Sequence, residues 1–401
     1  MLSVEEAQDR IVAATAPLAA EQVSLADALG RVLAEDLAAR RTQPPTDVSA
    51  MDGYAVRAED VAKPPVTLDV VGYAPAGGAH DSRLGAGQAV RIFTGGPVPD
   101  GADAIVIQEN TEAAGSSVTV RKSAAEGTYI RPAGLDFRTG DLLLEAGQVM
   151  TARGVGLAAA MNRPWLMVRR KPRVAILATG DEIVMPGDPV APHQIVSSNG
   201  LALAAAVRAF GGEPILLGIA PDDRDALARM AESARGADLL LTTGGASVGD
   251  HDLVKSVLGE SGLEIDFWRI AMRPGKPLMF GHYGETLMIG LPGNPVSTVV
   301  CAIIFVLPAL AGLLGADDVA LRPKKAVLGS PLPENDRRQD YLRATATYDA
   351  DGNRVVTAFD RQDSSMMAPL THADCLIVRL PHAPAAHAGQ AVEVLDIPPG
   401  V

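Results

Sequence analysis

The stretch "LLLTTGGASVGDHDLVK", residues 239–255, decides the fold class. It opens as an uncharged apolar strand, turns at Gly244 and Gly245, and continues into a helical pattern. Between a strand and a helix, such a glycine turn lets backbone N–H groups approach a phosphate or another oxyanion closely. Asp250 and Asp252 would repel that anion, so the stretch calls for a ligand that accepts both glycine amides and carboxylates.

Strands and helices alternate on both sides of this stretch. "RVAILAT" (173–179) and "PILLGIA" (214–220) are typical of buried strands, and helical patterns occupy 197–212 and 222–236. Three further strand-like runs, "EIDFWRIA", "PLMFG" and "TLMIG", precede a long apolar helix. This alternation predicts an α/β domain with a doubly wound parallel sheet. Ligands of such sheets bind beyond the carboxyl ends of the strands.

The rest of the chain has a different pattern. The first 40 or so residues predict two helices, "VEEAQDRIVAAT" and "SLADALGRVLAED", the second with Ser24 as its N-cap. Short strands separated by turns predict an all-β unit over 65–120, and "TARGVGLAAAMN" predicts another helix. After about residue 320 the helical patterns stop, and closely spaced strands indicate a small β-barrel or sandwich.

Composition excludes several classes of function. The chain has 401 residues, a net charge of −13 and only 4% aromatic residues. This charge argues against non-specific binding to nucleic acid or to anionic membranes, and few aromatics are available to stack on single-stranded bases. Cys301 and Cys375 are the only cysteines, which excludes a disulfide framework and a thiolate metal site and suits a reducing cytoplasm.

Two segments decide whether the sequence predicts a signal peptide or a membrane span. The N-terminus is acidic and amphipathic and lacks the basic and apolar regions of a signal peptide. The stretch 299–316 is uncharged over 18 residues, near the lower limit for a membrane span. It contains Pro308 and has no Lys or Arg flanking its N-terminal side, so a buried helix is the favoured interpretation and a span the alternative. We expect no membrane partner and a cytoplasmic location.

Three loops at the carboxyl ends of the predicted strands carry the candidate site. "ATGDEIV" supplies Thr179 and Gly180 for an anion and Asp181 and Glu182 as carboxylates. "TTGGASVGDHD" and "GLPGNP" supply further glycines, hydroxyls and a helix start. The alternatives are a plain strand–helix turn and exposed loop acids. For Asp222, in "PDDRDAL", the residues alone favour a helix N-cap.

A basic loop, "RIAMRPGKPLMF" (269–280), follows in the same domain. Arg269, Arg273 and Lys276 surround a Pro-Gly turn in an otherwise acidic protein, which indicates an anion clamp; a solvated basic loop is the alternative. The sequence has no GxxxxGK[ST] or HExxH motif, and "GVGLAA" (154–159) lacks the preceding strand that a dinucleotide fingerprint requires. Clustered Asp and Glu without thiols suit Mg²⁺ rather than a soft metal.

Taken in order, these loops resemble those of a known family. "PPTDVSAMDGYA", "TGGPVPDGADAIV" and "RPAGLDFRTGD" precede "TGDEIV", "SSN", "TTGGASVGDHD", "MRPGKP" and "GLPGNPVS". The combination resembles the MoeA family of molybdopterin molybdenumtransferases, which includes the gephyrin E domain. The resemblance extends from Val4 to the C-terminus.

The resemblance implies four domains and a homodimer. We expect an elongated N-terminal domain from 1–45 together with 139–171, and an inserted β domain at 46–138. A molybdopterin-binding α/β domain at 172–319 and a C-terminal β-barrel at 320–401 complete the chain. The second domain of one subunit would face the third domain of its partner, and the two would share the active site.

The reaction implied is molybdate insertion into adenylylated molybdopterin, with Mg²⁺-assisted release of AMP and formation of molybdenum cofactor. A molybdopterin adenylyltransferase is then expected as an upstream partner.

The resemblance also implies the site residues, motif by motif. The catalytic residues are Asp52, Glu182, Asp222, Asp252, Arg269 and Arg273. Of these, Glu182, Asp222 and Asp252 are the candidate metal ligands. The substrate-binding residues are Thr94, Arg131, Asp136, Thr179, Gly180, Asp181, Ser198, Asn199, Thr243, Gly244, Gly245, Ser247, Gly249, Lys276, Pro292, Gly293 and Asn294. Asp52, Thr94, Arg131 and Asp136 would come from the partner subunit.

The sequence departs from the family pattern at two places. Arg269 and Arg273 stand where Lys is common, which keeps the charge and adds a fork suited to oxyanions. Leu253 stands where an aromatic residue often follows the last aspartate. Two alternative functions remain: adenylylation of molybdopterin, as in the short single-domain MogA-type proteins, and a gephyrin-like scaffold without catalysis. The additional domains argue against the first, and the presence of Glu182, Asp252 and the basic loop argues against the second.

Overall fold

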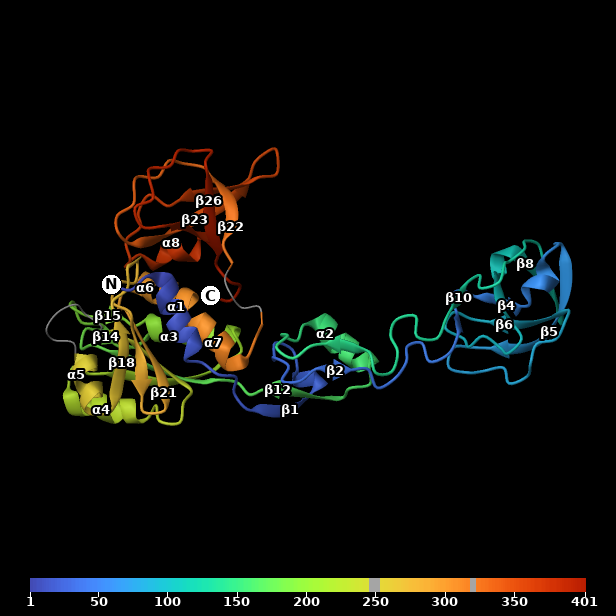
Figure 1. The fold of residues 1–401 in the computed structure, drawn as a ribbon, viewed down its shortest axis with the longest axis horizontal. Helices are drawn as coiled ribbons and strands as arrows, with labels where there is room; N and C mark the ends of the chain where they lie inside the picture. Colours follow the sequence, from blue (N-terminus) through green and yellow to red (C-terminus); the bar gives the residue numbers. More distant parts are fainter. Residues whose placement is uncertain (245–252, 318–321) are drawn as a thin grey trace.

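The chain forms an elongated molecule with three separate regions. The computed structural model describes residues 1–244, 253–317 and 322–401. An α/β unit and a small barrel lie together at one end, a slender unit lies in the middle, and an all-β unit lies at the far end (Figure 1). Both termini lie at the α/β end, so the chain runs out along the molecule and returns.

The α/β unit is built on a six-stranded sheet in the order β16-β13-β17-β21-β20-β18. Its strands are β13 (Arg173–Thr179), β16 (Glu213–Ala220), β17 (Leu239–Thr243), β18 (Leu263–Trp268), β20 (Met279–Tyr283) and β21 (Thr286–Leu291). The first four strands in this order are parallel, and β20 runs antiparallel to both of its neighbours. The predicted doubly wound parallel sheet is confirmed, with one reversed strand. Since β16 and β17 lie on opposite sides of β13, the topological switch point falls between β13 and β17.

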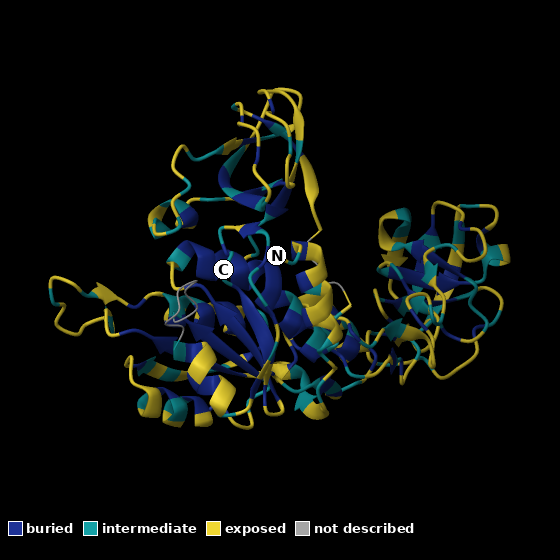
Figure 2. Cartoon of the chain, turned by 60° about the vertical axis from the view of Figure 1, so that its left-hand side comes forward, coloured by how far each residue is buried: buried dark blue, intermediate teal, exposed yellow. Residues whose placement is uncertain are grey.

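Helices cover both faces of this sheet. On one face lie α1 (Val4–Ala13), α3 (Asn199–Ala209) and one continuous helical stretch composed of α6 (Pro295–Cys301), η4 (Ala302–Val306) and α7 (Leu307–Leu314). On the other lie α4 (Arg224–Glu232) and α5 (Leu253–Glu260). Strands and inner helix faces are buried, and outer helix faces are exposed (Figure 2). This packing fixes the carboxyl edge of the sheet, where the three candidate loops begin.

The helix Pro295–Leu314 is the apolar segment weighed against a membrane span. It has 20 residues and a mean hydropathy of 2.5, so by length and composition it is long and apolar enough to cross a membrane. Of its most apolar window, 83% is buried inside the protein, as predicted for a core helix. The π-helical turn η4 precedes Pro308, which has no N–H to donate, and such a wide turn accommodates the missing bond.

Of the two helices predicted in the first 40 or so residues, the first is confirmed and the second is not. α1 forms as predicted, with the Ser3 side chain accepting a hydrogen bond from the N–H of Glu6 at 3.1 Å. The second predicted helix is wrong, because only the 3₁₀ turn η1 (Leu25–Asp27) forms and Gly30 then adopts φ +75°. Val32 and Leu33 instead make β-bridges to distant residues and are buried in the core of the middle unit. Tertiary burial has overridden the local helical pattern.

The middle unit is assembled from chain segments that are far apart in sequence. β1 (Ala20–Ser24) pairs with β12 (Trp165–Arg169), and β2 (Leu37–Ala38) pairs with β11 (Leu142–Leu144). The helix α2 (Ala152–Ala160) packs on η1 and contains the "GVGLAA" stretch, in agreement with its exclusion as a dinucleotide fingerprint.

Between Gln43 and Phe137 lies the all-β unit, called the β insert below. Its open sheet has the order β7-β4-β6-β5-β9-β8. The strands are β4 (Gly53–Val56), β5 (Val66–Ala74), β6 (Gln88–Ile92), β7 (Ala104–Ile107), β8 (Thr111–Ala114) and β9 (Ser117–Val120). Beside it, β3 (Val48–Ser49) pairs with β10 (Ile130–Arg131). The predicted all-β character of this segment is confirmed.

The C-terminal strands close into a five-stranded barrel. Around the ring they are β23 (Gln339–Tyr348), β24 (Arg354–Ala358), β22 (Lys324–Leu328), β26 (Ala391–Asp396) and β25 (Cys375–Arg379), which pairs again with β23. A two-residue strand from the α/β unit, β19 (Met272–Arg273), adds to β23. The prediction that helices stop is wrong at one place, where α8 (Met367–Thr371) packs on α6.

Candidate active site

A cavity of 740 Å³, called the edge cavity below, lies at the carboxyl edge of the α/β sheet next to the switch point. Parallel strands bring their terminal loops to one edge, so residues that are distant in sequence line it together. Among the predicted residues, those lining the edge cavity are Thr179, Glu182, Ser198, Asn199, Thr243, Gly244, Lys276, Pro292, Gly293 and Asn294. Ten residues chosen from separate loops thus share one cavity.

Asn199 ties the walls of the edge cavity together. Its Nδ2 donates to Thr243 Oγ1 at 2.9 Å and to the carbonyl of Gly293 at 2.7 Å. These two bonds connect the start of α3 with the ends of β17 and β21. A side chain bridging three elements holds them in one geometry, which a binding site requires if its donors are not to reorganise on binding.

The turn after β17 leaves room only for glycine. Gly244 has φ +88°, and a Cβ there would lie 2.5 Å from the carbonyl oxygen of Thr179. Thr179 is itself buried, and its hydroxyl has no hydrogen-bond partner among the described residues. An unpaired buried hydroxyl is costly, and a ligand in the adjacent cavity would relieve that cost.

Two helix N-termini open into the edge cavity. α3 begins after Ser198 and α6 begins after Asn294, and neither N-cap side chain bonds to the first turn of its helix. At α3 the N–H groups of the first turn, together with the helix dipole, attract anions. At α6 the dipole acts largely alone, because Pro295 has no N–H and the N–H of Val296 donates to the carbonyl of Ser364. Lys276 adds a positive charge to the same cavity. The cavity is therefore suited to a small anionic ligand.

The carboxylates lie at the rim of this edge. Asp181 accepts the backbone N–H of Asp222 through Oδ1 at 3.1 Å, so these two loops are adjacent. The N-cap prediction for Asp222 is wrong, because Asp223 caps α4 by accepting the N–H of Ala226 at 2.8 Å. The side chain of Asp222 therefore has no capping role, which keeps it available for the predicted metal role.

Mg²⁺ fits the type of donor here but not a complete cage. Within the described ranges, no group of three His, Cys, Asp or Glu residues is close enough to hold a metal ion. Mg²⁺ in phosphate sites is commonly held by one or two carboxylates together with the substrate's own oxygens. Glu182 lines the edge cavity, and Asp222 lies in the loop next to Asp181. Asp252, the third candidate, lies outside the described residues, as do Gly245, Ser247 and Gly249.

The three predicted cations do not converge on the edge cavity. Lys276 lines it, whereas Arg273 turns toward the barrel, pairs with the buried carboxylate of Asp340, and contacts Asp336 at 3.3 Å. Arg273 is drawn away because Asp340 lies buried beside β19 and needs a counter-charge. Arg269 places its guanidinium carbon 4.0 Å from the centre of the Trp268 ring. Only Lys276 of the predicted clamp contacts the cavity.

Sequence patterns missed the contribution of the barrel. Ser365 lines the edge cavity, and Ser364 accepts the N–H of Val296 at the start of α6 at 3.1 Å. Their loop is held by Arg343, whose buried guanidinium donates to the carbonyls of Met366 at 2.8 Å and Asp363 at 3.0 Å. Burial lowers the pKa of Arg343. No local sequence pattern predicts that an arginine inside a strand is buried, so the contribution of the Ser364–Ser365 loop to the edge cavity could not be predicted.

The other predicted residues lie in the β insert, at the opposite end of the molecule from the edge cavity (Figure 1). Asp52 Oδ1 accepts from the N–H of Thr94 at 2.7 Å and from its hydroxyl at 2.8 Å. These two donors, the backbone N–H above all, lower the pKa of the Asp52 carboxyl. Arg131 and Asp136 line a second cavity of 900 Å³, the insert cavity. The predicted residues thus form two groups, which one chain does not bring together.

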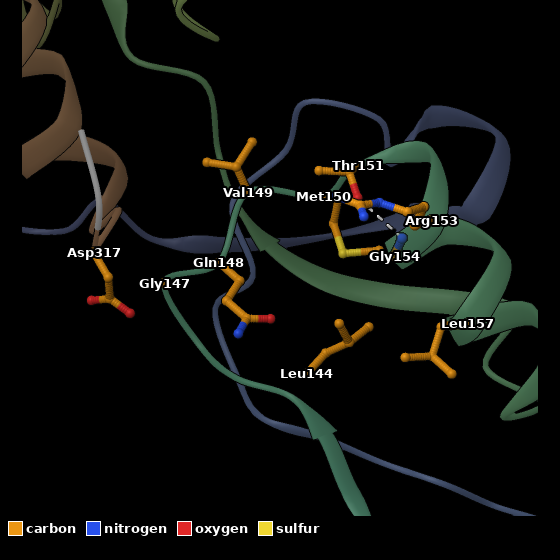
Figure 3. A pocket seen from close by; sticks show the side chains of 10 residues that line it. All are labelled: Leu144, Gly147, Gln148, Val149, Met150, Thr151, Arg153, Gly154, Leu157 and Asp317. Carbon is orange, nitrogen blue, oxygen red and sulfur yellow. Dashed lines mark hydrogen bonds between the residues drawn. The ribbon is translucent and has the colours of Figure 1, made fainter. Parts of the chain in front are cut away.

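A further cavity of 560 Å³ lies where the middle unit meets the end of α7. Figure 3 shows Asp317 beside Gly147, with Gln148, Leu144 and Leu157 on the other side of the space. Asp317 donates its N–H to the carbonyl of Gly147 at 3.2 Å, so the cavity lies at the contact between the middle unit and the α/β unit. It contains none of the predicted site residues.

The fold and the edge cavity together define a class of protein: a multidomain α/β protein with a cavity suited to a small anionic molecule at a switch point. Models of three regions match it: the MoeA N-terminal region (domain I and II) at residues 2–162, a probable molybdopterin binding domain at 175–312, and the MoeA C-terminal region (domain IV) at 325–397. The chain belongs to the MoeA family.

Named relatives agree over most of the chain. A molybdopterin molybdenumtransferase of Nostoc sp. is 41% identical, over 74% of this chain and 70% of the relative. Molybdopterin molybdenumtransferase 2 of Mycobacterium tuberculosis is 38% identical, over 87% and 89%. A crystal structure of a molybdopterin biosynthesis MoeA protein from Pyrococcus horikoshii has 32% identity and a TM-score of 0.85, covering 99% of both chains. The expected family and four-part fold are confirmed.

Proposed function

We propose that this protein is a molybdopterin molybdenumtransferase, which inserts molybdenum from molybdate into adenylylated molybdopterin and releases AMP. One observation carries the proposal: the edge cavity combines the N-termini of α3 and α6 with Lys276 and the Asn199 network. Relatives that carry the enzyme's name match the chain over most of its length, which supports the same activity here.

The chemistry of the cavity suits these substrates. Molybdate is a tetrahedral dianion like phosphate, so backbone N–H groups and Lys276 are appropriate donors. Cleaving a phosphoanhydride develops negative charge on phosphoryl oxygens, which fixed donors stabilise. The ene-dithiolate of molybdopterin supplies the sulfur ligands of molybdenum, consistent with two cysteines that are both buried away from the cavity.

Mg²⁺ is part of this proposal. Glu182, Asp222 and Asp252 would hold the ion, and its bound charge would offset the charge of the phosphate oxygens. Among the protein's own groups, Asn199 orients the loops, Lys276 contacts the anion, and the hydroxyl of Thr179 is positioned to donate to the ligand. We also place the enzyme in the cytoplasm, where its two free cysteines stay reduced.

We further propose a homodimer in which the β insert of one subunit completes the edge cavity of its partner. Asp52, Thr94, Arg131 and Asp136 lie far from the edge cavity of their own chain. A second copy placed head to tail would bring each insert to the other's edge, as twofold symmetry requires of a shared site.

Release of AMP tests the reaction directly. Purified protein is incubated with adenylylated molybdopterin, molybdate and Mg²⁺, and AMP is followed in a single turnover. Lys276→Ala should lower the rate about 10²–10³-fold, the usual cost of losing one group that stabilises developing charge. Lys325→Ala, on the exposed side of the barrel, is the matched control and should leave the rate unchanged. Lack of AMP release by the unaltered protein, with substrate bound, would refute the proposal.

Mixed dimers test the shared site. Asp52→Ala and Lys276→Ala proteins, each with reduced activity alone, are unfolded together and refolded as a mixture. Roughly one quarter of the sites should recover, because about half of randomly assorted dimers are mixed and each has one intact site. No recovery, in a mixture shown by mass spectrometry to contain mixed dimers, would exclude sharing.

A further inference from the structure

We propose that Arg91 is a positioning residue, which fixes the Asp52–Thr94 pair of the β insert in the geometry that the shared site needs. This inference rests on the proposed function, because it requires Asp52 to act at the edge cavity of the partner subunit. It assigns a role to Arg91, which the predicted site did not contain.

Arg91 lies in the interior of the insert sheet, on β6. Its partners in the strand register are Tyr54 on β4 and Tyr73 on β5. Residues opposite one another in paired strands share a face of the sheet, so these three side chains lie on one face. The guanidinium carbon of Arg91 is 5.1 Å from the centre of the Tyr54 ring and 4.8 Å from that of Phe93. Two aromatic rings therefore hold the arginine side chain in place.

The guanidinium of Arg91 bonds to the residues that flank Asp52. Its Nη1 donates to the carbonyl of Gly53 at 3.0 Å, and its Nη2 donates to Oε1 of Gln108 at 2.7 Å. Gly53 follows Asp52 in the chain, and the backbone N–H of Gln108 donates to the carbonyl of Asp52 at 3.1 Å. One planar fork thus joins the two chain segments that hold the backbone of Asp52.

The same side chain also contacts the segment that carries Thr94. Phe93, on which the guanidinium lies, directly precedes Thr94, whose N–H and hydroxyl both donate to Oδ1 of Asp52. Arg91 therefore contacts Gly53 beside the acceptor of these bonds and Phe93 beside their donor. Groups that act on a substrate must be held to within about 0.5 Å, and this task falls to neighbouring side chains. The contacts of Arg91 suit that task.

The charge of Arg91 acts on Asp52 as well. The donors of Thr94, the backbone N–H above all, lower the pKa of the Asp52 carboxyl, and the positive charge of Arg91 lowers it further. A nearby cation does so because it favours the ionised carboxylate. The competing interpretation is that Arg91 only stabilises the insert sheet. Loss of sheet stability would reduce activity whether or not Asp52 is present, whereas a positioning role requires Asp52.

A double-mutant cycle separates these two interpretations. Single-turnover AMP release is measured for the unaltered protein, Arg91→Gln, Asp52→Ala and the double variant, with thermal unfolding as a check on folding. Arg91→Gln should lower the rate about fivefold in the unaltered background. In the Asp52→Ala background it should lower the rate by less than about twofold, because the group that it positions is gone. Arg121→Gln, which breaks an exposed ion pair with Glu112 in the same unit, is the matched control and should leave the rate unchanged.

Arg91→Lys separates the geometry from the charge, and it completes the same cycle if Arg91→Gln fails to fold. Arg91→Gln removes a charge that lowers the pKa of Asp52, so the acid limb of its rate profile should move to higher pH. Arg91→Lys keeps the charge and loses the planar fork, so the limb should stay in place while the rate remains reduced.

Losses by the same factor with and without Asp52 would overturn this inference and leave the proposed function intact, as would full turnover in both Arg91 variants. Unchanged turnover in Asp52→Ala would overturn the inference together with the role of Asp52 in the shared site. Lack of AMP release by the unaltered protein would overturn the proposed function itself.

Discussion

The edge cavity and the insert cavity are built in different ways. Asn199 joins three elements around the edge cavity, and the Ser364–Ser365 loop of the barrel closes one wall. In the β insert, Asp52 is paired only with Thr94, and Arg131 and Asp136 are exposed. The described walls of the first region are held together by contacts within one chain, and the second region presents polar groups outward. This difference supports the proposal that the substrate binds in the edge cavity and that the β insert contributes side chains to the substrate bound by the partner subunit.

Among the changes that test this comparison of the two cavities, breaking the Asn199 network should have the largest effect. Asn199→Ala removes both bonds that connect α3 to the ends of β17 and β21, so the donors of the edge cavity lose their alignment. Turnover should fall about 10²-fold, because misplacement by about 1 Å is enough for such a loss. Asn110→Ala, in the insert and outside both cavities, is the control. Equal rates for both variants in the AMP assay would contradict the role of the network.

A smaller effect is expected in the β insert. Asp52→Ala should lower turnover roughly tenfold, because it removes one charge that the β insert contributes to the edge cavity of the partner subunit. The pH dependence sharpens this prediction. Because Thr94 lowers the pKa of Asp52 below its usual 3.8, the carboxylate stays charged as the pH falls until that lower value is reached.

Thr94→Val removes the hydroxyl donor and should raise the pKa of Asp52, so the acid limb of the rate profile should move to higher pH. Initial rates measured over a range of acidic pH would show this shift. An unchanged acid limb would mean that Asp52 does not act in the reaction through its charge.

The smallest effect distinguishes two adjacent acids at the edge. Asp223→Ala removes the N-cap of α4 and should lower the free energy of unfolding by about 1 kcal/mol, with little change in activity. Asp222→Ala should do the reverse, with reduced Mg²⁺-dependent turnover and nearly unchanged stability. Denaturant unfolding and the AMP assay measure both. Loss of activity in Asp223→Ala but not in Asp222→Ala would mean that Asp223, rather than Asp222, takes part in the Mg²⁺-dependent reaction.

Local patterns predicted the α/β fold because its signals are local. Apolar strands such as Arg173–Thr179, glycine turns and helix starts are each visible within a dozen residues. The loops predicted most residues of the edge cavity, because a parallel sheet brings the ends of its strands together, and the family resemblance added Ser198, Asn199 and Pro292. Recognition of the family added the two-part site, which no local pattern contains.

What could not be predicted depends on contacts between distant segments. Leu33 is buried by pairing with Val168, so its helical surroundings were misleading. Arg273 was expected at the anion, but Asp340, 67 residues away in sequence, holds its side chain.

The way the β insert is joined to the middle unit has a consequence for synthesis on the ribosome. Gln43 and Phe137 exchange backbone hydrogen bonds at 2.9 and 3.4 Å, and β1 pairs with β12 across more than a hundred residues. The middle unit therefore cannot complete its core until the whole insert and β12 have emerged. The insert, with its own closed set of contacts, can fold first. Its early folding brings Gln43 and Phe137 together and shortens the loop that the middle unit must close.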